Sequence, residues 1–402
     1  METTTYKISD IGEVVGGGTP STANSDFWGG DIPWISPKDL TGYKSVYISH
    51  GESFLTKTGL KSGTKLLPKG TVLFSSRAPI GYVAIASNPI CTNQGFKSII
   101  CNKEIINPLF LYYYIKGNLD YIKLFGTGAT FPEISGAAMR KIKVQIPTLP
   151  TQQKIASILS TYDRLIENNT RRIRLLEQMA ENLYKEWFVR FRFPEHEKVE
   201  MVNGLPKGWK IKKVSNVCET MGGGTPTTTN PAYWGGDIKW VTPSDITSKN
   251  SLALLKVKGR ITEEGLKKSS AKLLPPYTIL MTSRASIGFF GICPDSVCTN
   301  QGFISIIPNK ETFRMYLLYT FKSRKEEIIS NANGSTFLEI SKGRFRKMKV
   351  LVPPEDILDS FEKKTLLMFK VVLHLEYQNQ LLTRQRDLLL PRLMSGKLEV
   401  KS

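Results

Sequence analysis

The sequence has few of the residues that build metal sites and disulfides. Among 402 residues there are three histidines and five cysteines (Cys91, Cys101, Cys218, Cys293 and Cys298), with no Cys-x-x-Cys pair. These numbers favour neither a zinc site nor a disulfide framework, so we expect reduced cysteines that mostly serve as small core residues. No apolar run approaches the roughly 20 residues that span a bilayer. The start, METTTYKISD, also lacks the features of a secretory signal. We therefore expect a cytoplasmic protein with no metal and no segment that crosses a membrane.

Acidic residues are scarce relative to basic ones. Lys and Arg together number 55 against 35 Asp and Glu, which gives a formal net charge of +20. A surplus of this size favours a polyanionic partner such as nucleic acid or an anionic membrane, and the alternative is a basic protein with no such partner. With 41% hydrophobic residues, the chain is long enough for two or more domains, each with its own core.

The chain repeats itself once. FWGGDIPW at 27–34 recurs as YWGGDIKW at 233–240, an offset of 206 residues. CTNQGF at 91–96 recurs unchanged at 298–303, an offset of 207, so the second copy carries one inserted residue. The offset returns to 206 at KIKVQIP, which starts at Lys141, against KMKVLVP, which starts at Lys347. A period this long indicates a duplicated domain, because solenoid units run 20 to 50 residues.

Each copy begins with a globular part, residues 1–150 and 205–354. Short β-branched and aromatic runs such as TVLFSS and YVAIAS alternate with Gly, Pro, Asn and Asp, which predicts strands joined by turns. We expect one or two helices in each part, at 108–124 and at 313–330. The near-identical WGGD strings are expected to be shared structure, with the tryptophans as core anchors and Gly-Gly as a tight turn.

Each copy ends in a helical part, residues 151–204 and 355–402. No Gly or Pro occurs from 151 to 193 or from 355 to 390, which predicts long helices. About 36 residues make a rod of roughly 54 Å, longer than one domain needs. We therefore favour two helices that pack against each other, over the alternative that each packs only on its own domain.

Apolar residues recur along both helices with coiled-coil spacing. The second series lies 206 residues after the first, so the duplication preserves the heptad register. In the first helix, Ile158 and Leu165, then Ile173, Ala180 and Trp187, continue the stripe. The two series are Ile155, Tyr162, Asn169, Leu176 and Leu183, and Phe361, Met368, Leu375, Leu382 and Leu389.

These features together resemble the specificity subunit of type I restriction-modification systems. The resemblance lies in GGGTP…FWGGDIPW…SPKDL and SSRAPIG of the first copy, and in LPKGWK, GGGTP…YWGGDIKW…TPSDI and TSRASIG of the second. It continues in QQKIASILSTYDRLIENNTRRIRLLEQMAENLYKEWF and LLLPRLMSGKLE, so it covers essentially the whole chain.

The resemblance implies an α+β fold. Two similar globular target recognition domains are expected, separated by two long helices that form an antiparallel coiled coil with pseudo-two-fold symmetry. It implies double-stranded DNA, two methyltransferase subunits and restriction subunits as partners, and no membrane. S-adenosylmethionine, ATP and Mg2+ would belong to those partners, with no cofactor in this chain. One departure is EDILDSFEKKTLLMF, which lacks the QQKIASIL pattern and leaves the equivalence of the two docking surfaces open.

Two related domains imply a split DNA target. A rod of roughly 54 Å compares with about 34 Å per duplex turn, so half-sites about one turn apart are expected. Because the copies differ, for instance Lys38 against Ser244 and Pro33 against Lys239, we expect an asymmetric bipartite sequence. Base specificity is expected where the copies diverge, in loops 41–53 and 247–259.

Candidate DNA contacts fall into three groups, each with a structural alternative. Arg77 and Arg284 could bind guanine or phosphate, or instead pair with a carboxylate. Asn93 with Gln94, and Asn300 with Gln301, could read adenine, but identical strings favour scaffold or phosphate roles. Exposed cations could bind phosphates or could simply be solvated surface. These cations are Lys38, Arg140, Lys141, Lys143, Lys239, Arg344, Arg346, Lys347 and Lys349.

Catalytic signatures are missing. There is no Gly-x-x-x-x-Gly-Lys-Ser/Thr, and GGGTP is followed by no predicted helix. Asn230 to Tyr233 lacks the second proline of the amino-methyltransferase motif, and Asp356, Glu362 and Lys363 are only a loose scatter. We expect a non-catalytic recognition subunit. The alternatives are a stand-alone tandem DNA-binding regulator and a divergent methyltransferase that acts alone.

Overall fold

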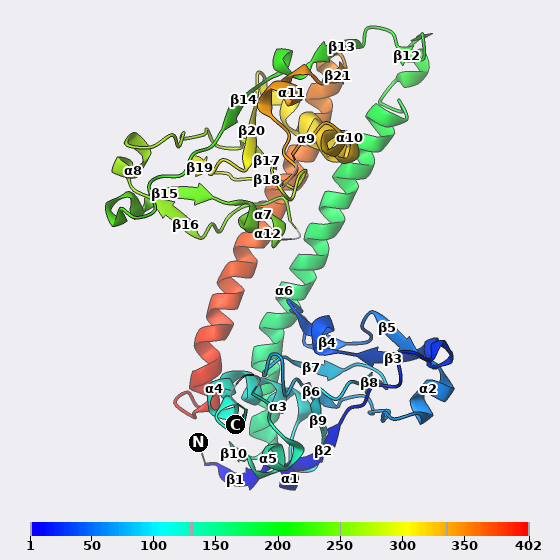
Figure 1. Cartoon of the computed structure of the whole chain (residues 1–402), viewed down its shortest axis with the longest axis vertical. Coiled ribbons are helices and arrows are strands. Elements are labelled where there is room, and N and C mark those ends of the chain that lie inside the picture. The colour runs from blue at the N-terminus through cyan, green and yellow to red at the C-terminus, as the bar shows by residue number, and fades with distance from the viewer. Residues whose placement is uncertain (1, 129, 131, 250, 335–336, 401–402) are drawn as a thin grey trace. The chain divides into compact units, whose positions relative to one another are not determined.

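The computed structural model describes residues 2–128, 130, 132–249, 251–334 and 337–400 (Figure 1). The chain divides into two compact units, Met1–Glu167 with Gln380–Ser402, and Asn168–Asn379. Each unit contains one globular domain and one end of both long helices, α6 (Leu149–Tyr184) and α12 (Glu355–Met394).

The domain of the first unit is built on two small sheets. In the larger one, β4 and β7 are parallel and the other neighbours are antiparallel. In the smaller one, β3 is antiparallel to β5 and parallel to β8. The larger sheet has the order β2 (Gly12–Gly16), β9 (Lys97–Cys101), β6 (Val72–Phe74), β7 (Val83–Ala86), β4 (Tyr47–Ile48), and the smaller has β5 (Ser53–Leu55), β3 (Trp28–Ile35), β8 (Cys91–Thr92).

The domain of the second unit repeats these pairings. The parallel pair Tyr47 and Ile85 of β4 and β7 has its counterpart in a single parallel bridge between Ala253 and Ile292. The duplication therefore extends to strand register. The larger sheet has the order β14 (Cys218–Gly222), β20 (Phe303–Pro308), β17 (Ile279–Thr282), β18 (Phe290–Ile292), and the smaller has β16 (Gly259–Ile261), β15 (Trp234–Val241), β19 (Val297–Thr299).

Each helix expected within a domain is interrupted. The segment 108–124 forms α3 (Pro108–Gly117) and α4 (Leu119–Lys123), and the segment 313–330 forms α9 (Arg314–Ser323) and α10 (Lys325–Ser330). The residues between them, Asn118 and Arg324, have φ near −118° and −104° with ψ near 23° and 27°, outside the α-helical region. The Asn118 amide also donates to Tyr114 O at 2.9 Å and so caps α3. The sequence pattern did not predict this break.

The short remaining elements frame the domains. Two-residue strands β11 and β12 pair in the segment between the copies, and a ribbon of two antiparallel strands precedes each long helix. The ribbons are β1 (Thr4–Lys7) with β10 (Lys143–Ile146), and β13 (Lys210–Lys213) with β21 (Lys349–Val352). The short helices are α1 (Ile8–Ile11), α2 (Lys57–Lys61), α5 (Gly136–Lys141), α7 (Pro243–Thr247), α8 (Glu263–Lys267) and α11 (Lys342–Lys347), and β11 and β12 are Met201–Val202 and Leu205–Pro206.

In each unit the two long helices pack on one another and on the domain. In the first unit, Ile155 and Leu159 of α6 join Leu393 of α12 in one core that also holds Phe110 of α3. In the second unit, Ile173 and Ala180 of α6 share a core with Val372 of α12 and the aromatic residues of α9. Packing between the helices and packing on the domain, which we weighed as alternatives, therefore occur together.

The helices are antiparallel in both units. In the first unit Asp163 forms an ion pair with Arg386, and in the second unit Asn169 donates to Gln378 Oε1 at 3.3 Å. Within the second unit the ring of Tyr184, later on α6, lies 6.4 Å from that of Phe361, earlier on α12. Within the first unit Ile155, earlier on α6 than Asp163, shares a core with Leu393, later on α12 than Arg386. In each unit residue numbers therefore rise along α6 while they fall along α12, which is the antiparallel arrangement that the resemblance implied. Beyond Tyr184 the first helix continues as a π-helical turn, Lys185–Val189.

The buried stripe follows a different path from the expected heptads at one end of α6. Ile158 and Leu165 are 36% and 45% exposed, whereas Leu159 and Asp163 are buried. A straight helix drifts by about 20° per heptad, and the stripe is set here by contact with both α12 and the domain. Of the two series, Ile155, Asn169, Phe361 and Leu375 are buried, and Tyr162, Leu176, Leu183, Met368, Leu382 and Leu389 are partly buried.

One polar contact inside the first unit differs from its counterpart in the second. Asp163 is 8% exposed, accepts from the Tyr113 hydroxyl and pairs with Arg386, whose side chain is 16% exposed. At the corresponding positions, 206 residues away, the second unit has Phe369 in place of Asp163 and Ala180 in place of Arg386, both buried. The same junction is therefore ionic in one unit and apolar in the other.

We predict that Arg386→Ala lowers the free energy of unfolding of the full chain by about 3 kcal/mol, because it leaves Asp163 buried without its cation. The measurement is urea unfolding. Arg384→Ala, at an exposed position two residues earlier, is the matched control and should change little. The double variant Asp163→Phe with Arg386→Ala copies the apolar junction and should recover part of the loss. Equal losses for both single variants would contradict a stabilising role for the ion pair.

Candidate DNA interface

The repeated WGGD strings form a paired-tryptophan support. The rings of Trp28 and Trp34 meet edge to face with centroids 5.1 Å apart, and those of Trp234 and Trp240 with centroids 5.0 Å apart. The indole of Trp34 donates to Gly18 O and that of Trp240 to Gly224 O, both at 2.9 Å. These bonds fasten the strand to the GGGTP turn in each copy. The two strings therefore have the same structural role.

Glycine is required where GGGTP meets CTNQGF. A Cβ on Gly17 would lie 2.1 Å from Asn93 O, and one on Gly223 would lie 2.1 Å from Thr299 O. Such distances are far below van der Waals contact, so only glycine allows the two backbones this approach. In each copy, the backbones of GGGTP and CTNQGF therefore pack directly against each other.

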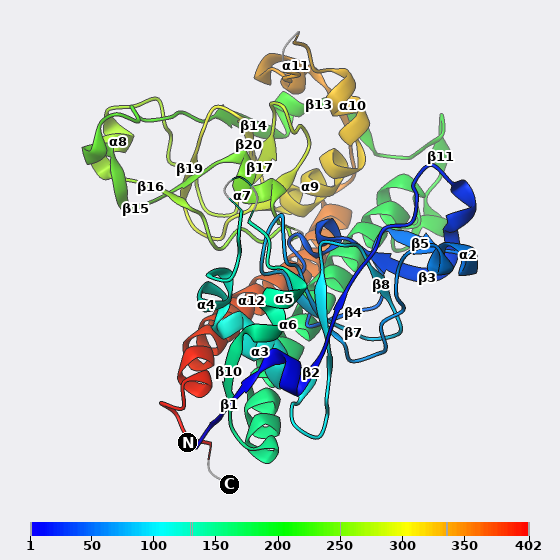
Figure 2. The same cartoon turned by 60° about the horizontal axis from the view of Figure 1, so that its bottom comes forward.

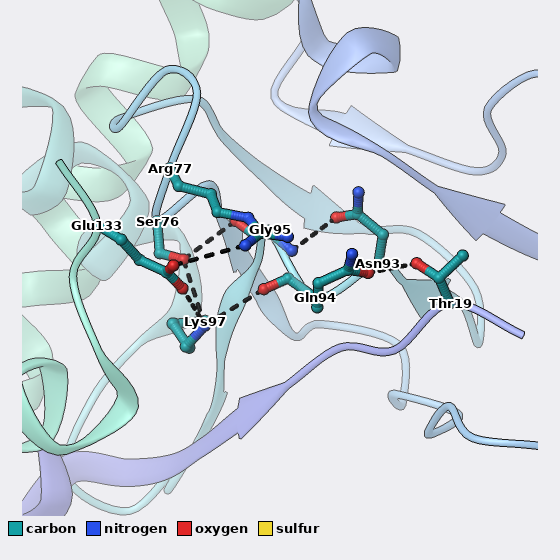
Figure 3. A network of polar contacts seen from close by, with 8 residues as sticks. All are labelled: Thr19, Ser76, Arg77, Asn93, Gln94, Gly95, Lys97 and Glu133. Atoms are coloured by element: carbon teal, nitrogen blue, oxygen red, sulfur yellow. Dashed lines mark hydrogen bonds and ion pairs between the residues drawn. The ribbon is translucent and has the colours of Figure 1, made fainter. Parts of the chain in front are cut away.

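The carboxamides of CTNQGF are hydrogen-bonded within each domain, and Figure 3 shows those of the first copy. The Asn93 side chain accepts from Gly95 N at 2.9 Å, and Asn300 accepts from Gly302 N at 3.0 Å. Gln94 Oε1 accepts from Thr19 Oγ1, and Gln301 Oε1 accepts from Thr225 Oγ1. Identical internal bonds in both copies favour the scaffold role over base reading.

Arg77 and Arg284 face a carboxylate but keep exposed surface. Arg77 Nη1 lies 3.6 Å from Glu133 Oε2, and Arg284 Nε lies 3.8 Å from Glu339 Oε2. In the first copy Lys97 Nζ also lies 3.1 Å from Glu133 Oε1 (Figure 3), whereas the corresponding position in the second copy is Ile304. The guanidinium side chains are 38% and 55% exposed, so pairing orients them without enclosing them.

The two cations at positions where the copies differ are both paired. Lys38 Nζ lies 3.0 Å from Glu52 Oε2 with its side chain 78% exposed, and the hydrogen bond to Glu52 raises the lysine pKa. Lys239 Nζ lies 2.5 Å from Asp295 Oδ2 and also donates to Leu255 O, and its side chain is only 18% exposed. Lys239 therefore braces its own domain, which favours a structural role over a DNA contact.

The basic residues around α5 and α11 divide by type. The arginines brace backbone: Arg140 donates to Val14 O at 3.3 Å, and Arg346 donates to Thr220 O and Oγ1 at 2.5 and 2.6 Å. Arg344 donates to Asn333 Oδ1 at 2.7 Å. The lysines, in contrast, are exposed at the end of the short helix and on the next strand. They are Lys141, Lys143, Lys347 and Lys349.

The diverging loops are fastened to α6 by a serine in each copy. Ser45 Oγ donates to Glu167 Oε1 at 3.3 Å in the first unit. In the second unit, Ser251 Oγ and Leu252 N donate to Glu177 Oε1 at 3.2 and 2.7 Å, and burial raises the pKa of the Glu177 carboxyl. Asn250 of the second loop lies outside the described residues.

Sequence reasoning missed these tethers. Apart from Thr41 and Thr247, the serines are the only residues that the two loops share at the 206-residue offset, which is a signal, but their glutamates come from different points of one helix. That pairing cannot be found from the repeat alone.

The glutamine that distinguishes the start of the first long helix is used inside its own unit. Gln152 is buried, donates to Ile105 O and Pro147 O at 2.9 Å, and accepts from Asn107 N. The corresponding residue of α12 is Leu358, also buried. Gln152 of the QQKIASIL pattern therefore serves the joint between helix and domain.

The buried thiols and the buried carboxyl of Glu362 have pKa values raised by burial. Across the described ranges, no three His, Cys, Asp or Glu side chains are grouped to hold a metal ion. Burial raises the pKa of Cys91 and Cys298 to about 11, which disfavours the reactive thiolate. Glu362 is buried on α12, where desolvation raises its pKa to about 7 and Met315 N donates to it. Among all the residues that the structure describes, no helix has the length and apolar content to cross a bilayer.

A known protein family matches both copies of the duplicated sequence. The family model described as "Type I restriction modification DNA specificity domain" matches residues 1–178 and 206–370. A type I restriction enzyme specificity subunit of Methanocaldococcus jannaschii, MjaIX, is 34% identical over 98% of this chain and 93% of its own length. The HindI specificity subunit of Haemophilus influenzae is 27% identical over 83% of this chain and 88% of its own length.

A solved structure supports the fold. The S subunit of a type I restriction-modification system from M. genitalium superposes with a TM-score of 0.63 at 17% identity, over the whole of this chain and 97% of that one. Because the family model matches both copies and a relative is similar over nearly the full length, the chain belongs to the type I restriction-modification DNA specificity family and is a non-catalytic DNA-recognition subunit.

Proposed function

We propose that this chain recognises a bipartite, asymmetric DNA sequence, one half with each copy of the duplicated domain. We assign recognition to residues 1–150 and 205–354, and subunit assembly to residues 151–204 and 355–402. The observation that carries the proposal is that the two copies share the structural elements beneath the loops, whereas the loops themselves differ. Strand register, the tryptophan pair and the CTNQGF bonds repeat between copies, whereas 41–53 and 247–259 differ in sequence and in burial.

The two diverging loops offer different chemistry to a base. In the first loop Tyr43 and Tyr47 are 40% and 49% exposed. In the second, Leu254 and Val257 are buried while Lys256 and Lys258 are exposed. A tyrosine can stack on or hydrogen-bond to a base and a lysine can bind guanine, so two different half-sites are expected. Arg77 and Arg284, identical and oriented alike, suit a contact that both halves share.

The long helices carry the surface that we assign to partner subunits. Leu175 of α6 and Leu381 of α12 stand 206 residues apart and are 45% and 42% exposed. Exposed leucines at corresponding positions are consistent with one methyltransferase subunit bound at each. Restriction subunits would join that assembly, and S-adenosylmethionine, ATP and Mg2+ would be held by these partners. Since the target is cellular DNA, we place this function in the cytoplasm.

Co-expression with a methyltransferase subunit tests the assignment against a stand-alone regulator. We expect a stable complex of one copy of this chain with two of the partner, which methylates only split sites. Native mass spectrometry gives the stoichiometry, and sequencing of methylated DNA gives the sites. Tight site-specific binding by the isolated chain, with no complex formed, would instead support the regulator.

Modularity can be tested separately. Replacing residues 1–150 with the matching domain of a relative should change one half of the methylated sequence and leave the other half as it was. The reciprocal replacement of residues 205–354 is the control and should change only the other half. Changes in both halves after either exchange would refute separate recognition.

If Leu175 and Leu381 each lie in one docking surface, a substitution at either should change the number of bound methyltransferase subunits. Leu175→Asp should remove one methyltransferase subunit, and Leu381→Asp the other, because each places a charge in an apolar contact. Val202→Asp, at a 45% exposed apolar residue outside the helices, is the matched control. Two bound subunits in both helix variants would place docking elsewhere.

A further inference from the structure

The ribbon before each long helix places two lysines directly opposite each other. β1 and β10 lie side by side in Figures 1 and 2, and their register pairs Lys7 with Lys143. In the second unit the antiparallel register of β13 and β21 pairs Lys213 with Lys349. Residues directly opposite in an antiparallel pair share a face, and like charges there are destabilising. Both ribbons therefore keep an unfavourable arrangement.

Both lysines of each pair stand at corresponding positions in the two copies, 206 residues apart. β1 reads TTYK and β13 reads KIKK, so only the final lysine is the same. That shared residue is the one that faces the second lysine. If the ribbon served folding alone, this position would have the least reason to stay fixed.

Neither pair is neutralised within its own unit. Throughout the described residues, none of these four ammonium groups lies within 4.0 Å of a carboxylate, and all four lysines are exposed. Asp10, three residues after Lys7, instead accepts from the backbone N–H of Lys7 at 2.8 Å. Other exposed lysines are paired, such as Lys207 with Glu200 at 2.9 Å and Lys310 with Glu355 at 2.7 Å.

We propose that the pairs Lys7–Lys143 and Lys213–Lys349 each clamp a phosphodiester group in the backbone of the DNA that the chain recognises. Opposed Cβ atoms stand about 5 Å apart in such a ribbon, so two ammonium groups can converge on one phosphate. A phosphate is the same at every sequence, which explains why the lysines persist while the reading loops diverge. Lys141 and Lys347, at the ends of α5 and α11, extend each basic surface.

This inference rests on the DNA recognition that the family establishes and requires neither the bipartite site nor a particular partner count. It adds Lys7 and Lys213 to the expected phosphate contacts and joins them into pairs. An acidic protein surface is the competing ligand, and the experiment separates the two.

The test uses the full chain in complex with its methyltransferase subunits. Affinity for a duplex that contains the methylated site and for an unrelated duplex is measured by fluorescence anisotropy from 50 to 300 mM salt, concentrations chosen because phosphate contacts are salt-dependent over roughly this range. The variants are Lys7→Gln with Lys143→Gln, Lys213→Gln with Lys349→Gln, and the four together. The control, Lys198→Gln with Lys207→Gln, removes two exposed lysines that pair with neighbouring glutamates.

Each double variant should make the slope of log affinity against log salt less negative by about 0.9, the value of one phosphate contact. Both duplexes should weaken by the same factor, and the methylated sequence should not change. Loss of the like-charge contact should raise the Tm of the free chain, so stability and binding move in opposite directions and misfolding cannot explain the result. Arginine at the same four positions should restore the slope.

Two results would overturn the proposal. One is an unchanged slope in the variant with all four lysines replaced. The other is loss of methyltransferase subunits from the complex with the DNA slope retained, which would identify an acidic protein surface as the ligand. Failure of the wild-type complex to methylate a split site would contradict the proposed bipartite function, and it would leave the salt slopes as a separate measurement.

Discussion

The joint between α6, α12 and a domain is the contact on which each unit depends. In both units the paired helix ends supply one wall of the main core, and the aromatic helix α3 or α9 supplies another. A domain cannot bury this aromatic helix without the helices, and the helices cannot bury their stripe without the domain. The orientation of each recognition surface is therefore tied to the helix pair by hydrophobic burial.

The two joints reach the same fold with different chemistry. The first uses Gln152 and the ion pair of Asp163 with Arg386, and the second uses Leu358, Phe369 and Ala180. A buried ionic contact costs desolvation and gives geometric specificity in return, whereas the apolar version is more tolerant. Both joints attach the long helices to the domain. The sequence difference between EDILDSFEKK and QQKIASIL therefore changes which side chains make that contact and leaves the antiparallel pairing in place.

Comparison of corresponding residues in the two copies separates structural residues from candidate functional ones. Residues that repeat in both sequence and contact, such as Trp34 with Trp240 and Asn93 with Asn300, serve the support. Residues that differ and take part in internal contacts, such as Lys239, serve one domain only. Residues that repeat in both copies but make no contact that explains the repetition are the best candidates for binding a ligand. The opposed lysine pairs are such residues.

The repeated strings predicted the duplication, and the hydrophobic patterns predicted the α+β domains and two long packed helices, because such patterns record local structure directly. The antiparallel direction of the helix pair came from the family resemblance. It missed the break at Asn118 and the buried path through Asp163, which depend on tertiary contacts. Lys143 was already a candidate, but its partner Lys7 lies far away in the chain and only strand register joins them. A like-charge pair that folding should disfavour is visible only in three dimensions, and there it points to a ligand that the sequence alone does not place.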